Sequence, residues 1–154
     1  IDIIDSVMSL KNSFNIPIPI LIRRINLLEN QKNDAEFKTF LIGFKRVHNV
    51  LNHSDISKFR LNKVNETLFK IDEERELFKI VNFLEGQINK FEFDINSQNL
   101  IINQFLKLDH IIEAFFEKVI VNDTNERVKF NRLSLLNELS DNINKFSKFN
   151  LILV

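Results

Sequence analysis

The chain has 154 residues, with 21 basic and 21 acidic side chains, so its formal net charge is zero. This length suits one ordinary domain and is too short for two independent hydrophobic cores. The absence of cysteine excludes disulfide frameworks, thiolate metal sites and cysteine nucleophiles. The longest apolar run, at residues 16–22, is far shorter than the roughly 20 residues that span a bilayer. Because the chain begins with Ile1 rather than Met, we expect it to be a piece of a longer protein.

The spacing of apolar residues indicates helices throughout. Glycine and proline number two each, too few for the tight turns that sheets need. Apolar residues recur every three or four positions over 37–51, 77–91 and 130–146. Each stretch places an apolar stripe along one side of a helix, and such stripes must pack against each other to leave water. The sequence therefore predicts an all-α fold, a bundle of about six to seven helices forming one domain over residues 1–154.

The predicted helices follow each other closely along the chain. Pro17 and Pro19 favour a helix start just after them, because proline fits the first turn and obstructs the helix interior. The apolar stripe changes phase near Asp109, which predicts a break between two helices there. The least periodic segment, 52–69, is predicted to be the principal loop. In chain order, the predicted helices are 2–13, 19–31, 34–52, 72–92, 97–107, 109–120 and 124–148.

Helix-start residues support three of these bounds. Asn33 and Asp34 can cap the third helix, and Thr124 or Asn125 can cap the last one, because their side chains accept hydrogen bonds from free backbone N–H groups. The acidic run 72–74 places negative charge on the first turn of the fourth helix, where it complements the helix dipole.

The residues that enzymes use for chemistry are sparse in this sequence. Gly43 and Gly86 lie inside helical patterns, so no glycine-rich phosphate loop can form. His48 and His53 are five residues apart and therefore do not stack on one helical face as metal ligands would. The acidic cluster at 72–76 is typical of a solvated helix start. We therefore expect neither catalytic residues nor a metal site in this chain.

Several blocks of sequence resemble a known family. They read KRVHNVL at 45–51, IEAFFEKVIV at 112–121, KFNRLSLL at 129–136 and FSKFNLI at 146–152, with shorter matches over 64–77. In this order and spacing they resemble the β subunit of bacterial heterotetrameric glycyl-tRNA synthetase, whose blocks read K-R-V-x-N-I-L, D-A-F-F-D-x-V-M-V and L-R-x-N-R-L. The chain has Lys129 where the family has the first Arg of the last block, and it lacks a literal D-A-L-R tetrapeptide.

This resemblance implies a role in translation. The matching region of the family is its C-terminal anticodon-binding domain, a helical domain of the DALR type. The parent enzyme is an α₂β₂ ligase that uses ATP and Mg to attach glycine to its tRNA, with the aminoacylation site mainly on the α subunit. The expected partners are therefore the glycine-specific tRNA and, through the parent chain, the α subunit, in the cytoplasm. The segment itself is expected to hold no cofactor and to contact neither DNA nor a membrane.

Cations concentrate on separate predicted helices, and they provide the candidate RNA contacts. Arginine suits such contacts because its guanidinium offers two parallel donors to phosphate and a plane on which unpaired bases stack. Arg23 and Arg24 form a further basic pair. The candidate RNA-binding residues are Lys45, Arg46, Asn49, Lys129, Asn131 and Arg132.

Each candidate also has a structural interpretation. Arg46 and Arg132 could instead bond helix-end carbonyls or a carboxylate, and Asn131, like Asn49, could cap or bridge helices. Phe115 and Phe116 are expected in the core rather than in a stacking surface. At the level of function, the alternative is a helical protein–protein interaction domain that makes no RNA contact, which zero net charge and wide apolar stripes would also suit.

Overall fold

A computed structural model describes residues 2–11, 13–55, 63–91 and 93–153. These residues form helices and connecting loops, with no strand among them, so the predicted all-α class is confirmed. No described helix is both long enough and apolar enough to cross a bilayer. The α-helices are α1 (Asp2–Met8), α2 (Ile18–Gln31), α3 (Ala35–Asn52), α4 (Asp72–Phe91), α5 (Gln98–Leu106), α6 (Asp109–Lys118) and α7 (Glu126–Ile143). Short 3₁₀ turns are η1 (Ser13–Asn15), η3 (Glu66–Leu68), η4 (Ile95–Ser97) and η5 (Phe149–Leu151).

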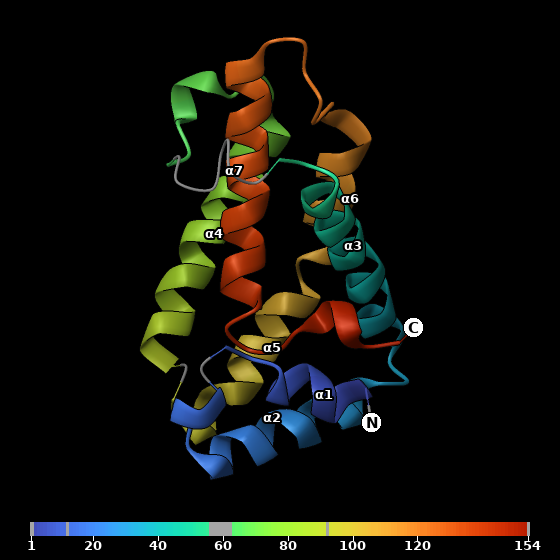
Figure 1. Ribbon diagram of the computed structural model, residues 1–154, viewed down its shortest axis with the longest axis vertical. Helices are drawn as coiled ribbons and strands as arrows, with labels where there is room; N and C mark the ends of the chain where they lie inside the picture. The colour runs from blue at the N-terminus through green and yellow to red at the C-terminus, as the bar shows by residue number, and fades with distance from the viewer. Residues whose placement is uncertain (1, 12, 56–62, 92, 154) are drawn as a thin grey trace.

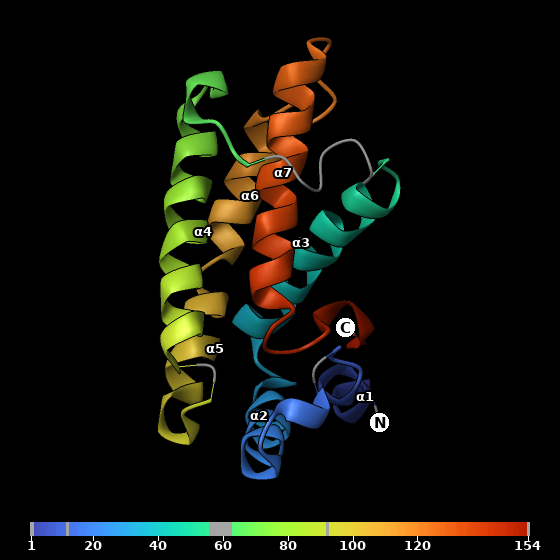
Figure 2. The same ribbon diagram turned by 60° about the vertical axis from the view of Figure 1, so that its left-hand side comes forward.

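The helices α3, α4, α6 and α7 make up the main body. α7 packs against α4 on one side and α3 on the other, and α6 also contacts both α3 and α4 (Figures 1 and 2). α1 and α2 lie side by side at the opposite end from the start of α7, where α5 and η5 join them and both chain termini are found. The N-terminal helices therefore form a base beneath the four-helix body.

Phenylalanine rings fill the junction between the body and the base. Phe40 on α3 and Phe149 on η5 meet edge to face, with ring centroids 5.3 Å apart and an interplanar angle of 87°. Phe105 on α5 stacks on Phe40 at 6.1 Å. Aromatic pairs in these geometries stabilise a core beyond the area that they bury. The fully buried rings of this cluster are Phe37, Phe40, Phe44, Phe105, Phe146 and Phe149.

Arg24 ties α2 to the end of α7. Its side chain is fully buried, and its guanidinium donates hydrogen bonds to the Lys145 and Phe146 carbonyl oxygens, at 2.9 and 3.2 Å, and to Gln98 Oε1 at 2.9 Å. The last carbonyls of a helix have no partner within the helix, so a donor from elsewhere satisfies them. Arg24 is thus part of the interior, and the predicted basic pair with Arg23 is not a surface feature.

The predicted helix ends were correct where capping residues mark them. Asp34 accepts a hydrogen bond from Phe37 N, and Asn125 accepts from Arg127 N and Val128 N. α5 and α6 are separated at residues 107–108, as the phase change near Asp109 predicted. The principal loop is described only in part: η3 lies in it, and residues 56–62 are outside the described residues.

Two predicted helices extend too far. The first ends at Met8 rather than at residue 13, because the backbone changes to three-residue turns, from Leu10 N to Val7 O and from Ser13 N to Leu10 O. The last ends at Ile143 rather than at residue 148. There too the backbone changes to three-residue turns, from Lys145 N to Asn142 O and from Phe146 N to Ile143 O, and Lys148 N donates to Ser6 O instead.

Candidate nucleic-acid interface

After its first turn, which contains the exposed Glu36, the solvent-facing side of α3 carries cations without acids. From Phe37 to Ser54 the chain has no Asp or Glu, although it contains Lys38, Lys45 and Arg46. None of these three side chains forms an ion pair with a carboxylate of the described residues. Helical periodicity places them on one face with two neutral residues. We call this set the α3 outer face: Lys38, Ile42, Lys45, Arg46 and Asn49.

Arg46 stacks on an aromatic ring from the neighbouring helix. Its guanidinium carbon lies over the Phe116 ring of α6, 4.3 Å from the ring centroid. Arg46 itself is exposed, whereas Phe116 is half-buried and packs against the hydrophobic core. A cation over an aromatic face is attracted by the ring quadrupole, and this contact restrains the position of the guanidinium. Among the described residues, no hydrogen bond or ion pair joins Arg46 to a helix-end carbonyl or to a carboxylate.

The two phenylalanines at 115 and 116 have different environments. Phe115 is fully buried, as expected from the sequence. Phe116 contacts it edge to face, at 5.5 Å and 83°, and Arg46 lies over the Phe116 ring. The expectation of core packing thus holds fully for Phe115, while Phe116 links the core to the α3 outer face.

Histidines at the end of α3 border the same face. His48 Nε2 lies 2.9 Å from Asn52 Nδ2, so a neutral His48 ring accepts the amide N–H. Burial, followed by the positive charge of Lys148, lowers the pKa of His48. The neutral ring is therefore favoured, and the positive charge of this region comes from the lysines and Arg46. Asn49 is exposed on α3, and its backbone oxygen lies 2.7 Å from His53 Nδ1.

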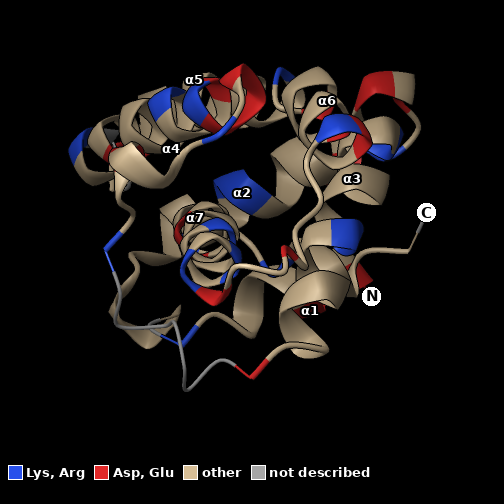
Figure 3. Ribbon diagram, turned by 90° about the horizontal axis from the view of Figure 1, so that it is seen from above, with Lys and Arg blue, Asp and Glu red and all other residues tan. Residues whose placement is uncertain are grey.

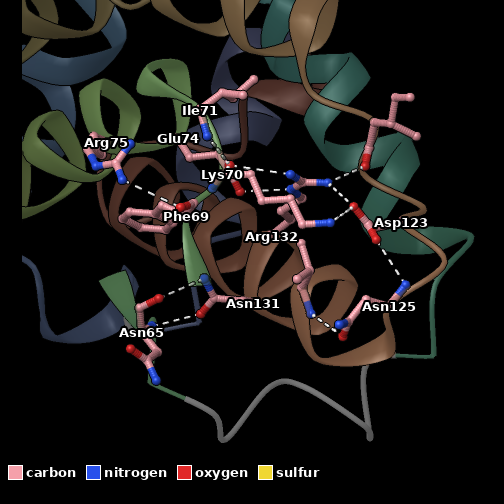
Figure 4. Close-up of polar contacts among 12 residues, drawn as sticks. Asn65, Phe69, Lys70, Ile71, Glu74, Arg75, Asp123, Asn125, Asn131 and Arg132 are labelled. Atoms are coloured by element: carbon pink, nitrogen blue, oxygen red, sulfur yellow. Dashed lines mark hydrogen bonds and ion pairs between the residues drawn. The ribbon is translucent and has the colours of Figure 1, made fainter. Parts of the chain in front are cut away.

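Arg132 occupies an internal ion-pair network, which corrects its predicted place on an RNA-binding surface. Its exposed fraction is 3%, and its Nε donates to Glu74 Oε1 at 2.8 Å while Nη2 donates to Glu74 Oε2 at 3.3 Å. Nη1 donates to Ile120 O at 2.8 Å and to Asp123 Oδ2 at 2.9 Å (Figure 4). Paired carboxylates and hydrogen bonds of this kind offset the cost of burying a guanidinium. Arg132 therefore joins α7 to α4 and to the α6–α7 loop.

Asn131 is also internal. Its side-chain Nδ2 donates to Asn65 O at 3.0 Å, and its Oδ1 accepts from Asn65 N at 2.7 Å (Figure 4). Its exposed fraction is 5%. The Asn131 amide thus acts as both donor and acceptor, and it connects α7 to the segment before η3. This is the structural role, bridging elements of the fold, that the sequence offered as the alternative to RNA contact. Neither Asn131 nor Arg132 is therefore available as an RNA contact.

Lys129 is the remaining candidate on α7. It is half-buried and makes no ion pair with a carboxylate of the described residues. No hydrogen bond or ion pair among the described residues joins it to α3. The six predicted contacts therefore divide into three on the α3 outer face, one separate lysine on α7 and two interior side chains.

Several cations outside α3 are paired with acids. Lys118 on α6 pairs with Glu73, Lys70 pairs with Asp123 at 2.8 Å, and Lys79 pairs with Glu76 at 2.8 Å. In the view from the end where α7 begins, basic and acidic positions are both distributed over the helices and their connecting loops (Figure 3). Among the described residues, no group of three or more His, Asp or Glu side chains is placed to hold a metal ion.

The residues that sequence reasoning missed were Lys38, Ile42 and Glu74. An acid-free run from 37 to 54 was the signal for the α3 outer face. The signal for Glu74 was its position three residues before the buried Leu77, on the same apolar stripe of α4. Arg132 lies on such a stripe too, four residues before the buried Leu136.

Comparison with known proteins places these observations in a family context. The model of the DALR anticodon binding domain family matches residues 41–148, which include most of α3 and all of α4 to α7. The chain is similar to proteins named glycine–tRNA ligase beta subunit. Over 127 residues it is 34% identical to that of Thermodesulfovibrio yellowstonii, with 81% of this chain and 18% of the relative covered. To the protein of Lactobacillus acidophilus the chain is 33% identical over 151 residues, with 96% of this chain and 20% of the relative covered. For Rickettsia akari it is 30% over 149 residues, with 91% and 22% covered. The chain thus spans about a fifth of the length of these relatives.

Proposed function

Since this chain belongs to the DALR anticodon binding domain family, we propose that it is the tRNA-binding domain of a glycine–tRNA ligase β subunit. The relatives that carry this name cover most of the chain, and this similarity supports the proposal. The parent enzyme would attach glycine to its tRNA with ATP and Mg²⁺, in partnership with an α subunit. This chain would contribute recognition of the anticodon region and none of the bond-forming chemistry.

The observation that carries the proposal is the pattern of unpaired charge on α3. Phosphate contacts supply most of the affinity of proteins for nucleic acids, and a lysine can make them only if no internal carboxylate occupies it. Lys38 and Lys45 meet this condition, and the 18 residues of α3 extend over roughly 27 Å. Zero net charge is compatible with RNA binding because the acids are concentrated on other elements, such as the first turn of α4.

Neutral residues on the same face suit the bases of a single-stranded loop. Ile42 is 60% exposed between the lysines, and Asn49 offers an amide donor and acceptor one turn after them. Sequence-specific RNA recognition usually targets loops, whose splayed bases present both apolar faces and polar edges. An anticodon loop has this chemistry. Lys129 remains a proposed second phosphate contact on α7.

A salt titration of tRNA binding tests the interface. We expect Lys38→Gln combined with Lys45→Gln to weaken binding of a glycine-specific tRNA transcript. The slope of log affinity against log salt should fall by about 0.7–0.9 for each phosphate that is no longer neutralised. Lys79→Gln, which removes a paired cation from α4, is the matched control and should leave the slope unchanged. Equal slopes for the double variant and the control would contradict this interface.

A protein-interaction domain is the second candidate function. Exposed apolar side chains on η1 and α2 favour it, because Phe14 is 98% exposed, Ile18 70% and Ile22 53%. The two functions differ in the titration: an interaction domain without RNA contact would show no salt-dependent tRNA binding. Replacement of the anticodon in the transcript then tests anticodon recognition itself, and we expect a foreign anticodon to bind more weakly.

A further inference from the structure

The strongest unassigned feature of the α3 outer face is the layered pair of Arg46 and Phe116. We propose that the guanidinium plane of Arg46, supported by Phe116, is a stacking platform for one unpaired base of the bound RNA. This inference rests on the proposed function, and it specifies the mode of contact at that surface. Arg46 acts through its plane and its fixed orientation, whereas Lys38 and Lys45 act through charge alone.

The support beneath Arg46 is rigid. Phe116 packs against the hydrophobic core and contacts the fully buried Phe115 edge to face. α6 approaches α3 closely here, since a Cβ built on Gly43 would lie 3.3 Å from Ile112 Cγ2. A side chain already held in its binding geometry loses little conformational entropy when the ligand arrives. The ring therefore orients the guanidinium before RNA binds.

The environment of Arg46 distinguishes it from other arginines of the chain. Arg24 also lies near a ring, 4.9 Å from the centroid of Phe146, but it is fully buried and bonded to backbone carbonyls. Arg132 is buried among carboxylates, and Arg75 pairs with Asp72 at 3.4 Å. Arg46 is exposed, and no described carboxylate pairs with it. Its guanidinium thus lies over the Phe116 ring, while the side chain as a whole is exposed to solvent.

The surroundings suit a base better than a phosphate. A phosphate is bound by the edge of a guanidinium, through its N–H donors, and needs no aromatic support. A base stacks on the face of the guanidinium, and arginine planes bind splayed RNA bases in this way. Ile42, one turn earlier on the same face, adds apolar surface, and Asn49, three residues later, adds an amide that can reach a base edge. Arg46 thus offers a planar surface for stacking, Ile42 an apolar surface beside it, and Asn49 a hydrogen-bonding amide.

The test uses the whole chain and distinguishes the contribution of the Arg46 guanidinium plane to RNA binding from that of its positive charge. Arg46→Lys keeps the charge and removes the plane, Arg46→Gln removes both, and Lys45→Gln is the neighbouring charge control. The probe is the glycine-specific tRNA transcript, unmodified or with single anticodon-loop nucleotides replaced by abasic ones. We expect Arg46→Lys to weaken binding about tenfold with an unchanged salt slope. One abasic position should weaken binding by the unchanged chain to a similar extent and have no further effect on Arg46→Lys.

The other outcomes are equally informative. If Arg46→Lys binds like the unchanged chain while Arg46→Gln lowers the salt slope by about 0.7–0.9, Arg46 contacts phosphate and the platform is overturned, although the proposed function stands. If every abasic position weakens binding by Arg46→Lys as much as binding by the unchanged chain, the platform is likewise overturned. If the unchanged chain shows no salt-dependent tRNA binding, both the proposed function and the platform fail. Phe116→Leu provides a second readout, because it should reproduce the loss in Arg46→Lys with the cation still present.

Discussion

Arg132 on α7 and Glu74 on α4 hold each other through two hydrogen bonds, of 2.8 and 3.3 Å, with side chains that are only 4% and 0% exposed. Glu74 Oε2 also accepts hydrogen bonds from Lys70 N at 2.7 Å and Ile71 N at 3.1 Å, before the first turn of α4. A single buried pair thus connects two long helices and orders the approach to one of them. Removal of either partner leaves an uncompensated charge in the interior.

We therefore predict that Arg132→Met destabilises the protein by about 3–5 kcal/mol, because Glu74 loses its buried counter-ion. Urea unfolding measures this change. Arg132→Met combined with Glu74→Leu should be less destabilised than the sum of the single variants, since the pair is then replaced by apolar side chains. The exposed Arg127→Met on the same helix is the control, within about 0.5 kcal/mol of the unchanged protein. A cost below about 1 kcal/mol for Arg132→Met would show that the pair is not needed.

Low pH should lower the stability of the protein, because it protonates Asp123, a partner of Arg132. The Lys70 ammonium, the backbone N–H of Asn125 and the charge of Arg132 lower the pKa of Asp123 to about 2. A carboxylate with a lowered folded-state pKa contributes stability above its unfolded value near 3.8, and this contribution is lost as the pH falls toward 2. We predict that the stability difference between the unchanged protein and Asp123→Asn, measured by urea unfolding, narrows from pH 5 to pH 2. A constant difference for Asp123→Asn would exclude this linkage.

The two glycines should respond differently to alanine. Gly86 lies inside α4, and beyond the neighbouring helix backbone nothing lies within 4 Å of the position that an alanine methyl group would occupy, so Gly86→Ala should stabilise the helix by about 0.5–1 kcal/mol. At Gly43 the same methyl would meet the buried Ile112 at 3.3 Å, where α3 packs on α6. We expect Gly43→Ala to lose this gain and to destabilise the protein. Thermal unfolding of the two variants, compared side by side, checks the order, and a Gly43→Ala variant as stable as Gly86→Ala would contradict it.

The start of α7 depends on one capping side chain. Asn125 Oδ1 accepts hydrogen bonds from Arg127 N at 3.0 Å and from Val128 N at 3.4 Å. We predict that Asn125→Ala costs about 1 kcal/mol, the usual effect of removing a helix cap. Thr124→Ala is the matched control and should cost less, because Thr124 is exposed and does not cap the helix. Urea unfolding distinguishes the two, and equal costs would mean that capping does not determine stability here.

The sequence was sufficient for the family and for most helix bounds. Long apolar stripes located α3, α4 and α7, and the resemblance to glycyl-tRNA synthetase β subunits predicted the DALR-type domain that the family match confirms. Asp34 and Asn125 were among the named capping residues because a cap involves only neighbouring residues. The predicted end of α7 was wrong, since Lys148 N donates to Ser6 O on α1, at 2.8 Å, rather than to a carbonyl of α7.

The candidate site was harder to predict because burial of a charge depends on a distant partner. Arg132 is separated from Glu74 by 58 residues, and Asn131 from Asn65 by 66, so neither pairing is visible in a local pattern. The apolar stripe through Leu136 would have indicated that Arg132 faces inward. The aromatic support of Arg46 also comes from another helix, and the sequence placed Phe116 only in the core.

The position of Arg24 has a practical consequence for anyone who trims the gene. The family match begins at residue 41, so a fragment cut to that boundary would discard α1 and α2 together with Arg24. It would also remove Ser6, whose hydroxyl accepts from Ser147 Oγ at 2.8 Å and whose carbonyl accepts from Lys148 N at 2.8 Å. Phe37 and Phe40, two rings of the phenylalanine cluster, would be lost as well, together with the fully buried Ile3 and Leu28. A fragment expressed for binding assays should therefore include α1 and α2, although the family match begins only at residue 41.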